Sequence, residues 1–231
     1  MVRAAIPPVS TSRRRDLGAF VLPVVVLSTL TCWAGHPVVL RAQAASSPAR
    51  PAGTQPRAEP KPQPRPHGTR VMVPPSLLSV DDGDTVVVKW PGGDVETVRL
   101  LGIDTPETRH LEHNLPYGQP FGAAARAFLS GVLAATTEAE LLRSRTLDPY
   151  GRTLGYLFVN RRNYSVLVVN ARLAAESITQ FGDNGLPAEA ADVLRAAKAA
   201  GPLPFESPGA FRARMREVTR WMKERGIYPS N

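Results

Sequence analysis

The stretch TVVVKWPGGDVETVRLLGIDTPET, residues 85–108, decides the fold. A β-branched run leads through a Pro-Gly-Gly turn into a longer apolar run that ends near Ile103. Two such runs joined by a short turn predict neighbouring antiparallel strands. The second run carries Arg99 and is followed directly by Asp104 and Glu107. Since an unpaired charge beside a core is costly, these three side chains need partners.

Further strands and helices are predicted on both sides of this pair. The strands are 76–81, 138–144 and 153–160, and the helices lie within 116–133, within 166–176 after Ser165 as N-cap, and from Pro187 to a stop at Gly201. A strand meander followed by a helix, two strands and more helices is an α+β order. Five short strands are the number that closes an OB-type β-barrel, so we expect a five-stranded barrel with about three packed helices.

A last amphipathic helix is predicted near the C-terminus. It begins with Ser207 as cap and Pro208 at the first position, and it stops at Gly226. Its apolar stripe is Phe211, Met215, Val218 and Met222, with Trp221 at the edge. Two interpretations stay open: a helix docked on the barrel with a solvated basic face, or a nucleic-acid contact surface.

The N-terminal third has the composition of an export signal and a linker. Three arginines, an apolar stretch and a small-residue AQA site make 1–44 a predicted signal peptide, with an uncleaved membrane anchor as the alternative. Residues 45–75 are rich in Pro, Ala and Arg and predict a disordered linker. The expected location is therefore extracytoplasmic, either secreted or periplasmic, or membrane-anchored. This division leaves 76–200 as the folded domain and 201–231 as a helical extension.

The strongly basic balance belongs to that N-terminal third. The chain has 28 Lys and Arg against 20 Asp and Glu, but residues 1–75 hold ten basic and two acidic side chains. The rest is neutral, so a nucleic-acid site could not depend on bulk positive charge. The one cysteine, Cys32, lies in the apolar N-terminal segment, which excludes a disulfide framework or a thiolate metal site.

Four acidic side chains gather near predicted strand ends. Asp82 and Asp84 flank a glycine, while Asp104 and Glu107 flank Thr105-Pro106. Carboxylates beside backbone carbonyls are the hard oxygen ligands that Ca²⁺ prefers. A DDGD stretch alone is more often a hydrogen-bonded turn than a metal site.

Two arginines extend this acidic set toward phosphate chemistry. Arg99 lies in an apolar strand and Arg152 follows a DPYG turn. Two guanidiniums, a cation and carboxylates are what phosphoryl transfer requires. Arg99 and Asp104 are an odd number of residues apart, so a regular strand would point them to opposite faces. We expect a bulge or bend at Gly102 to bring both to one side.

Four motifs in order resemble the staphylococcal nuclease (thermonuclease) family. They are DDGDT at 81–85, VRLLGIDTPET at 98–108, PYGQPFGAAARAFL at 116–129 and DPYGRTLGYLFV at 148–159. The similarity runs from about Ser76 to Ala200. It implies an OB-fold barrel and a Ca²⁺-dependent hydrolase that acts on phosphodiester bonds of DNA and RNA and leaves 3′-phosphate ends.

The resemblance also implies roles for individual residues. Asp84, Asp104 and the Thr105 carbonyl would bind Ca²⁺, with Asp82 supporting them. In the same way, Arg99 and Arg152 would hold the phosphate and stabilise the transition state, Glu107 would act as general base or water positioner, and Tyr150 would contact a terminal phosphate.

The chain departs from the family pattern where the substrate would be gripped. The stretch SITQFGDN has none of the family's nucleotide-stacking tyrosines, and only Phe181 could stack. Arg172 replaces the glycine that usually ends the second helix, and Pro149 replaces a basic residue. The rival interpretations are a catalytically silent module that binds nucleic acid or protein, and a Ca²⁺-stabilised structural domain. We favour a monomeric nuclease, because the full set of acids and arginines is present.

Overall fold

The computed structural model describes residues 60–229. The predicted signal or anchor, and residues 45–59 of the predicted linker, lie outside this range. Among the described helices, none combines the length and apolar character that a membrane crossing requires.

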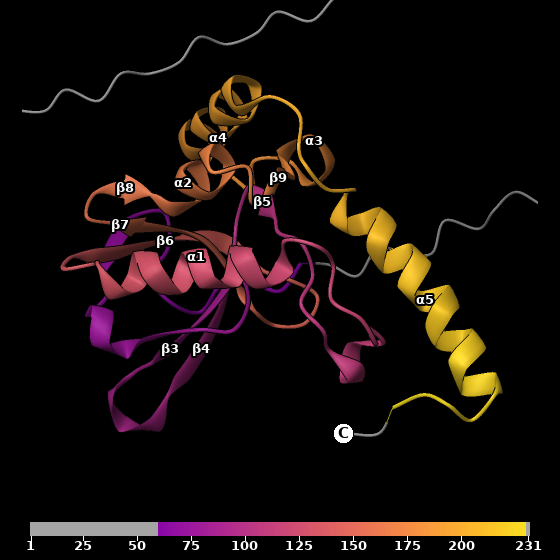
Figure 1. The fold of residues 1–231 in the computed structure, drawn as a ribbon. Helices are drawn as coiled ribbons and strands as arrows, with labels where there is room; N and C mark the ends of the chain where they lie inside the picture. The colour runs from indigo at the N-terminus through magenta and orange to yellow at the C-terminus, as the bar shows by residue number, and fades with distance from the viewer. Residues whose placement is uncertain (1–59, 230–231) are drawn as a thin grey trace, which may run out of the picture. The chain divides into compact units, whose positions relative to one another are not determined.

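A mixed sheet dominates the described part of the chain (Figure 1). Its strands are β1 (Arg70–Met72), β2 (Leu78–Val80), β3 (Thr85–Lys89), β4 (Val95–Leu100), β6 (Ala139–Leu147), β7 (Thr153–Val159) and β8 (Arg162–Asn163). The hydrogen-bonded order is β1-β6-β7-β4-β3-β2, and β8 pairs with β7. A second, two-stranded sheet pairs β5 (Ile103–Asp104) with β9 (Ala175–Glu176). The α+β class is therefore confirmed.

The prediction of a closed five-stranded barrel is not confirmed, because the sheet is open. The order of paired strands is open, because β1 and β2 stand at its two ends and pair with different strands. These two strands follow one another in the chain, separated by Pro74 and the 3₁₀ turn Pro75–Leu77. Proline has no N–H to donate to a ladder, so Pro74 and Pro75 interrupt strand pairing between β1 and β2.

Five helices accompany the sheet in the described range. They are α1 (Gly122–Ala134), α2 (Tyr164–Asn170), α3 (Ile178–Phe181), α4 (Pro187–Ala200) and α5 (Pro208–Glu224). Helix α2 packs on α4 and on β7, and α1 contacts β2 and α2. The single turn α3 was not predicted. The start of α4 at Pro187 and its end before Gly201 are confirmed.

Helix α2 is shorter than predicted and has a different cap. Asn163 is the N-cap, and its side chain accepts from the Ser165 backbone N–H, so the prediction of Ser165 as cap is wrong. The helix ends before Arg172, which takes a left-handed conformation with φ of 57°. This is the position where the sequence lacks the usual glycine, and the left-handed backbone explains why glycine is favoured there.

Ordered chain begins earlier than the predicted boundary at 76. Gln63 is buried, and its backbone N–H donates to the Arg145 carbonyl at 2.8 Å. Arg65 donates to Asp94 at 2.8 Å, and β1 adds to the edge of β6. The prediction of a disordered linker is therefore wrong for 60–75, because these residues find backbone partners on β6 that composition does not reveal.

Strand β4 carries two charged side chains toward opposite sides. Its burial alternates, so that Glu96 lies on the buried face with Val98 and Leu100, whereas Arg99 lies on the other face. On the buried face Glu96 pairs with Arg143, at 2.7 Å from Nε to Oε1. The consequence is that one strand supplies the core with a carboxylate and the opposite face with a guanidinium.

Helix α5 packs on a loop rather than on the main sheet. The Ser207 cap and the Pro208 start are confirmed, and the helix ends at Glu224, before Gly226. Phe211 and Met215 are buried against Leu115, in a cluster separate from the main core. Figure 1 shows α5 extending away from the sheet. The loop between β5 and α1 is thus its support.

Candidate active site

The turn before β3 and the end of the β4–β5 segment meet around one carboxylate. Asp84 is only 5% exposed. Its Oδ2 accepts from the Thr105 backbone N–H at 2.8 Å and from the Thr105 hydroxyl at 2.9 Å, while its Oδ1 lies 2.6 Å from Nη1 of Arg99. Three of the residues predicted from sequence are therefore in direct contact.

Gly102 makes the bend that the sequence analysis required. Its φ is +78°, and it lies between the end of β4 and the start of β5. Beyond it, Nη2 of Arg99 lies 3.2 Å from Oδ1 of Asp104, so both side chains are on one side. A Cβ at this position would lie 3.0 Å from the Tyr156 hydroxyl. The prediction of a bend at Gly102 is confirmed.

A second arginine closes the group from the far end of the chain. Arg212 of α5 donates from Nη1 and Nη2 to the two carboxylate oxygens of Asp104, at 3.1 and 2.9 Å. Its Nη1 also forms an ion pair with Oε1 of Glu107. Asp104 thus lies between Arg99 and Arg212. We call Asp84, Arg99, Asp104, Glu107 and Arg212 the acid–arginine cluster.

The electrostatics of this cluster are dominated by burial of negative charge. Burial raises the pKa of Asp84 to about 7, against the opposing effect of Arg99. Burial likewise raises the pKa of Glu107, although its ion pair with Arg212 opposes the shift. The positively charged partners of these two carboxylates therefore do not fully offset the cost of burying their negative charge.

Hydrogen bonds from neighbouring elements hold the loops in place. The Asp82 carboxylate accepts from the Asp84 backbone N–H at 3.0 Å, so it contacts the turn that carries Asp84. From α2, the Tyr164 hydroxyl donates to the Gly83 carbonyl at 2.9 Å, and the Ser165 hydroxyl donates to the Leu101 carbonyl at 2.8 Å. One helix therefore fixes both the turn that carries Asp84 and the end of β4.

Gln119 fixes the Glu107 loop, and sequence analysis did not single it out. Its backbone N–H donates to the Glu107 carbonyl at 2.8 Å, and its side-chain Oε1 accepts from the Glu107 N–H at 3.2 Å. Its Nε2 donates to the Glu206 carbonyl at 2.7 Å, just before α5. The signal that could have found it is its place inside the PYGQPFG motif.

Arg152 and Tyr150 lie in a separate turn. Asp148 accepts from the backbone N–H of both residues, and its Oδ2 accepts from Nε of Arg152 at 2.6 Å. Tyr150 is 86% exposed, with the Arg152 guanidinium 5.7 Å from its ring centre. Of the predicted site residues, these two are therefore not joined to the acid–arginine cluster by a hydrogen bond or ion pair.

The register of the parallel β4–β7 ladder brings the Arg152 turn to the end of β4. Leu154 of β7 is opposite Arg99. Arg152 precedes Leu154 by two residues and lies just before β7, where its side chain pairs with Asp148.

Comparison with known proteins gives the same assignment as the geometry. Residues 97–200 match the family model described as staphylococcal nuclease homologue. This region of the chain is similar to the staphylococcal nuclease family. It is similar to the Thermonuclease of Staphylococcus intermedius, with 38% identity over 95 residues, which are 41% of this chain and 54% of the relative.

Other relatives of the staphylococcal nuclease domain carry related names. The Thermonuclease of Staphylococcus hyicus is 32% identical over 104 residues, 45% of this chain and 56% of that protein. A prophage-derived endonuclease of Bacillus subtilis is 34% identical over 94 residues, 40% of this chain and 30% of that protein. The chain thus spans about half the length of the two thermonucleases that it matches.

The matched region of the staphylococcal nuclease family does not include every member of the acid–arginine cluster. Arg99, Asp104 and Glu107 lie within 97–200, whereas Asp84 precedes it and Arg212 follows it. Arg212 was missed by sequence analysis, because a basic residue on an amphipathic helix reads as part of a solvated face.

The donors of this nuclease-family site suit a hard cation. Asp84 and Asp104 share one guanidinium, that of Arg99, and the Thr105 backbone is held against Asp84. All the side-chain donors are carboxylate oxygens, and three carboxylates face two guanidiniums. A divalent ion therefore fits the residues present, and both the donor type and the excess negative charge favour it.

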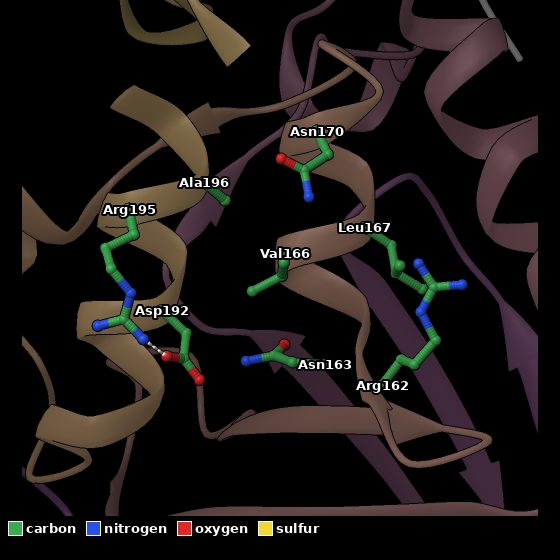
Figure 2. Close-up of a pocket in the computed structure, with 8 residues that line it drawn as sticks. All are labelled: Arg162, Asn163, Val166, Leu167, Asn170, Asp192, Arg195 and Ala196. Atoms are coloured by element: carbon green, nitrogen blue, oxygen red, sulfur yellow. Dashed lines mark hydrogen bonds and ion pairs between the residues drawn. The ribbon is translucent and has the colours of Figure 1, made fainter. Parts of the chain in front are cut away.

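Two other features of the nuclease-family domain lie apart from the cluster. His110, Glu112 and His113 place possible ligand atoms within 4.8 Å of one another on the loop that supports α5. A hollow of about 490 Å³ lies between α2 and α4 and is lined by Val166, Asn170 and Arg195, among others (Figure 2). Asn163 lines this hollow as well, and its buried Nδ2 has no hydrogen-bond partner. None of the predicted catalytic residues lines the hollow.

Proposed function

We propose that the chain is a Ca²⁺-dependent nuclease that hydrolyses phosphodiester bonds of DNA or RNA, breaking the P–O5′ bond and leaving 3′-phosphate ends. The observation that carries the proposal is the bridging of Asp84 and Asp104 by Arg99, in contacts of 2.6 and 3.2 Å. The names of the relatives in the family support the same chemistry.

Arg99 is the first phosphate-binding group of the proposal. Its side chain is 20% exposed and is held by Asp84, Asp104 and the Ile103 carbonyl. Such fixed donors form bidentate contacts with phosphate oxygens without reorganising. Arg99 would therefore meet the charge that develops on the phosphoryl oxygens.

Glu107 is proposed to orient or deprotonate the attacking water. Its raised pKa, caused by burial, makes this carboxylate a better proton acceptor than an ordinary glutamate. Gln119 holds the Glu107 backbone by two hydrogen bonds, and the Glu107 carboxylate shares Nη1 of Arg212 with Asp104. The proton of the water would pass to a Glu107 oxygen as the new P–O bond forms.

Arg152 and Tyr150 complete the proposed grip on the substrate. Tyr150 is exposed, so a terminal phosphate could reach its hydroxyl. Arg152 would exchange its partner Asp148 for a phosphate oxygen, at the cost of one partly exposed ion pair. Arg152 therefore has to leave Asp148 before it can bind a phosphate.

The proposed cofactor is Ca²⁺, held by Asp84, Asp104 and the Thr105 carbonyl, with Asp82 holding the Asp84 turn. When bound, the ion would neutralise charge developing on the phosphate during the reaction. The proposed location remains extracytoplasmic, since the basic and apolar N-terminal segment has the order of an export signal.

The decisive experiment is cleavage of single-stranded DNA by the full chain, with Ca²⁺ and with excess EDTA. We expect cleavage that requires Ca²⁺ and yields 3′-phosphate ends, detected by end-labelling. Asp104→Asn should abolish it, whereas Asp192→Asn, on an exposed face of α4, should not. Binding of DNA without any cleavage would instead favour the silent binding module.

A further inference from the structure

Arg212 occupies the two carboxylates on which the proposed reaction depends. It takes both oxygens of Asp104 and one oxygen of Glu107. The Asp104 and Glu107 side chains are 13% and 16% exposed, and the Arg212 side chain is 35% exposed. A partly exposed guanidinium on a more deeply buried acid pair can leave more easily than the acids can.

The helix that carries Arg212 is built onto the Glu107 loop. The Thr219 hydroxyl and Nζ of Lys223 donate to the carbonyl and side chain of Asn114, at 2.9 and 2.7 Å. The Tyr228 hydroxyl donates to the Leu111 carbonyl at 2.6 Å. With the small apolar cluster around Leu115, these contacts place Arg212 over the acids by a built interface.

Charge balance decides what this contact does. Arg212 contacts both oxygens of Asp104, which are the atoms that a divalent ion would have to coordinate. The positive charges of the guanidinium and of a cation bound beside it would repel each other at so short a distance. We propose that Arg212 is a positioning residue that holds Asp104 and Glu107 before a cation binds and competes with that cation for Asp104, so that α5 sets the cation affinity of the site. This inference rests on the proposed function, since it concerns the same cation.

The consequence for the reaction concerns Glu107 as well as Asp104. While Arg212 pairs with Glu107, one oxygen of that carboxylate is occupied by the guanidinium. Displacement of Arg212 by cation and phosphodiester would free both acids together. The arginine would thereby link occupation of the cation site to readiness of the water-activating group.

Calorimetric titration of the full chain with Ca²⁺, without nucleic acid, tests this directly. Arg212→Met removes the charge and keeps the apolar stem, so we expect Ca²⁺ binding about tenfold tighter or more. The matched control is Arg216→Met, which removes the same charge from an exposed position of α5 and should stay within about twofold of the parent chain. Arg212→Lys keeps the charge and should lie between the two.

A second readout guards against a variant that fails to fold. The Ca²⁺-induced rise in melting temperature should be larger for Arg212→Met than for the parent chain, by linkage, whatever the melting temperature without Ca²⁺. Equal or weaker Ca²⁺ binding by Arg212→Met would overturn the inference, and Ca²⁺-dependent cleavage by the parent chain would then leave the proposed function standing. Absence of both Ca²⁺ binding and cleavage in the parent and in both Arg212 variants would overturn the two together.

Discussion

Strand β4 contributes to two arginine–carboxylate groups that contain the same kinds of side chain but differ in their burial and in their hydrogen-bond partners. On the buried face, Glu96 and Arg143 are each 2% exposed and meet at 2.7 Å. On the other face, Arg99 meets Asp84 and Asp104, and Asp104 is also held by Arg212, whose side chain is 35% exposed. The two groups begin only three residues apart in the sequence.

Saturation separates the two groups. Glu96 also accepts from the Thr153 hydroxyl at 2.7 Å and from the Trp90 indole at 2.9 Å, and Arg65 lies 3.6 Å away. Burial raises the pKa of Glu96, but these hydrogen bonds and Arg143 outweigh it and hold that pKa below its ordinary value. For Asp84 and Glu107, burial prevails over the partners instead and raises the pKa of both carboxyls. A saturated pair stabilises a fold, whereas an undersaturated cluster retains affinity for a ligand.

The largest expected effect is a loss of activity from a change in the acid–arginine cluster that leaves the buried Glu96–Arg143 pair intact. Glu107→Gln removes the proton acceptor and should lower turnover by about 10²- to 10⁴-fold, with little change in melting temperature. The measurement is single-turnover cleavage at saturating Ca²⁺. Glu217→Gln, on the exposed face of α5, is the control with the same chemical change. Full activity in Glu107→Gln would remove this residue from its proposed role.

Breaking the buried Glu96–Arg143 pair should have the reverse effect, a loss of stability without a loss of turnover. Arg143→Met leaves Glu96 buried without its main partner and should cost about 3–5 kcal/mol of unfolding free energy, measured by denaturant titration. Turnover per folded molecule should be unchanged. Arg70→Met, which breaks a more exposed pair with Glu140 at 3.5 Å, should cost less than about 1 kcal/mol. Similar losses in both variants would mean that the buried pair is not special.

A substitution of Gly102 tests whether the backbone bend is needed to bring Arg99 and Asp104 together. Gly102→Ala should cost about 1–2 kcal/mol, because φ is +78° and the new methyl meets the Tyr156 hydroxyl. It should also lower turnover, since it disturbs the bend that joins Arg99 to Asp104. Gly92→Ala has a similar φ of +84° in open space and should lose stability without losing activity. Equal activity in the two variants would contradict the bend's role.

A pH dependence of opposite sign is also expected for the two groups. The pKa of Asp84 is raised from 3.8 to about 7, so its contribution to stability is present below about pH 3.8 and is lost as the pH rises to about 7. Glu96 behaves oppositely, since its lowered pKa makes its contribution disappear as the pH falls. In Ca²⁺-free buffer, the difference in unfolding free energy between the parent chain and Asp84→Asn should therefore fall from pH 4 to pH 7. A flat difference would contradict this.

Local chemistry in the sequence predicted part of this molecule well. The bend at Gly102, the Ser207 cap and the limits of α4 follow from backbone preferences of glycine, serine and proline. The pairing of β1 with β6 and the ordering of 60–75 depend on partners distant in sequence, and composition carries no record of them.

The candidate site shows the same limit. Asp84, Arg99 and Asp104 were identified because charges next to apolar runs stand out in a sequence. Arg212 and Gln119 do not stand out, because an arginine on an amphipathic helix and a glutamine in a loop are ordinary at the surface. Only the docking of α5 and the folding of the Glu107 loop give them partners.

The separation of 108 residues between Asp104 and Arg212 also orders events during synthesis. The chain through α4 leaves the ribosome before α5 does, so the matched nuclease-family region is complete while Asp104 and Glu107 still lack this arginine. Distant contacts of this kind form late, because loop closure must precede them. For a nascent chain the last helix is therefore a late addition that changes the ion balance of a cluster assembled earlier.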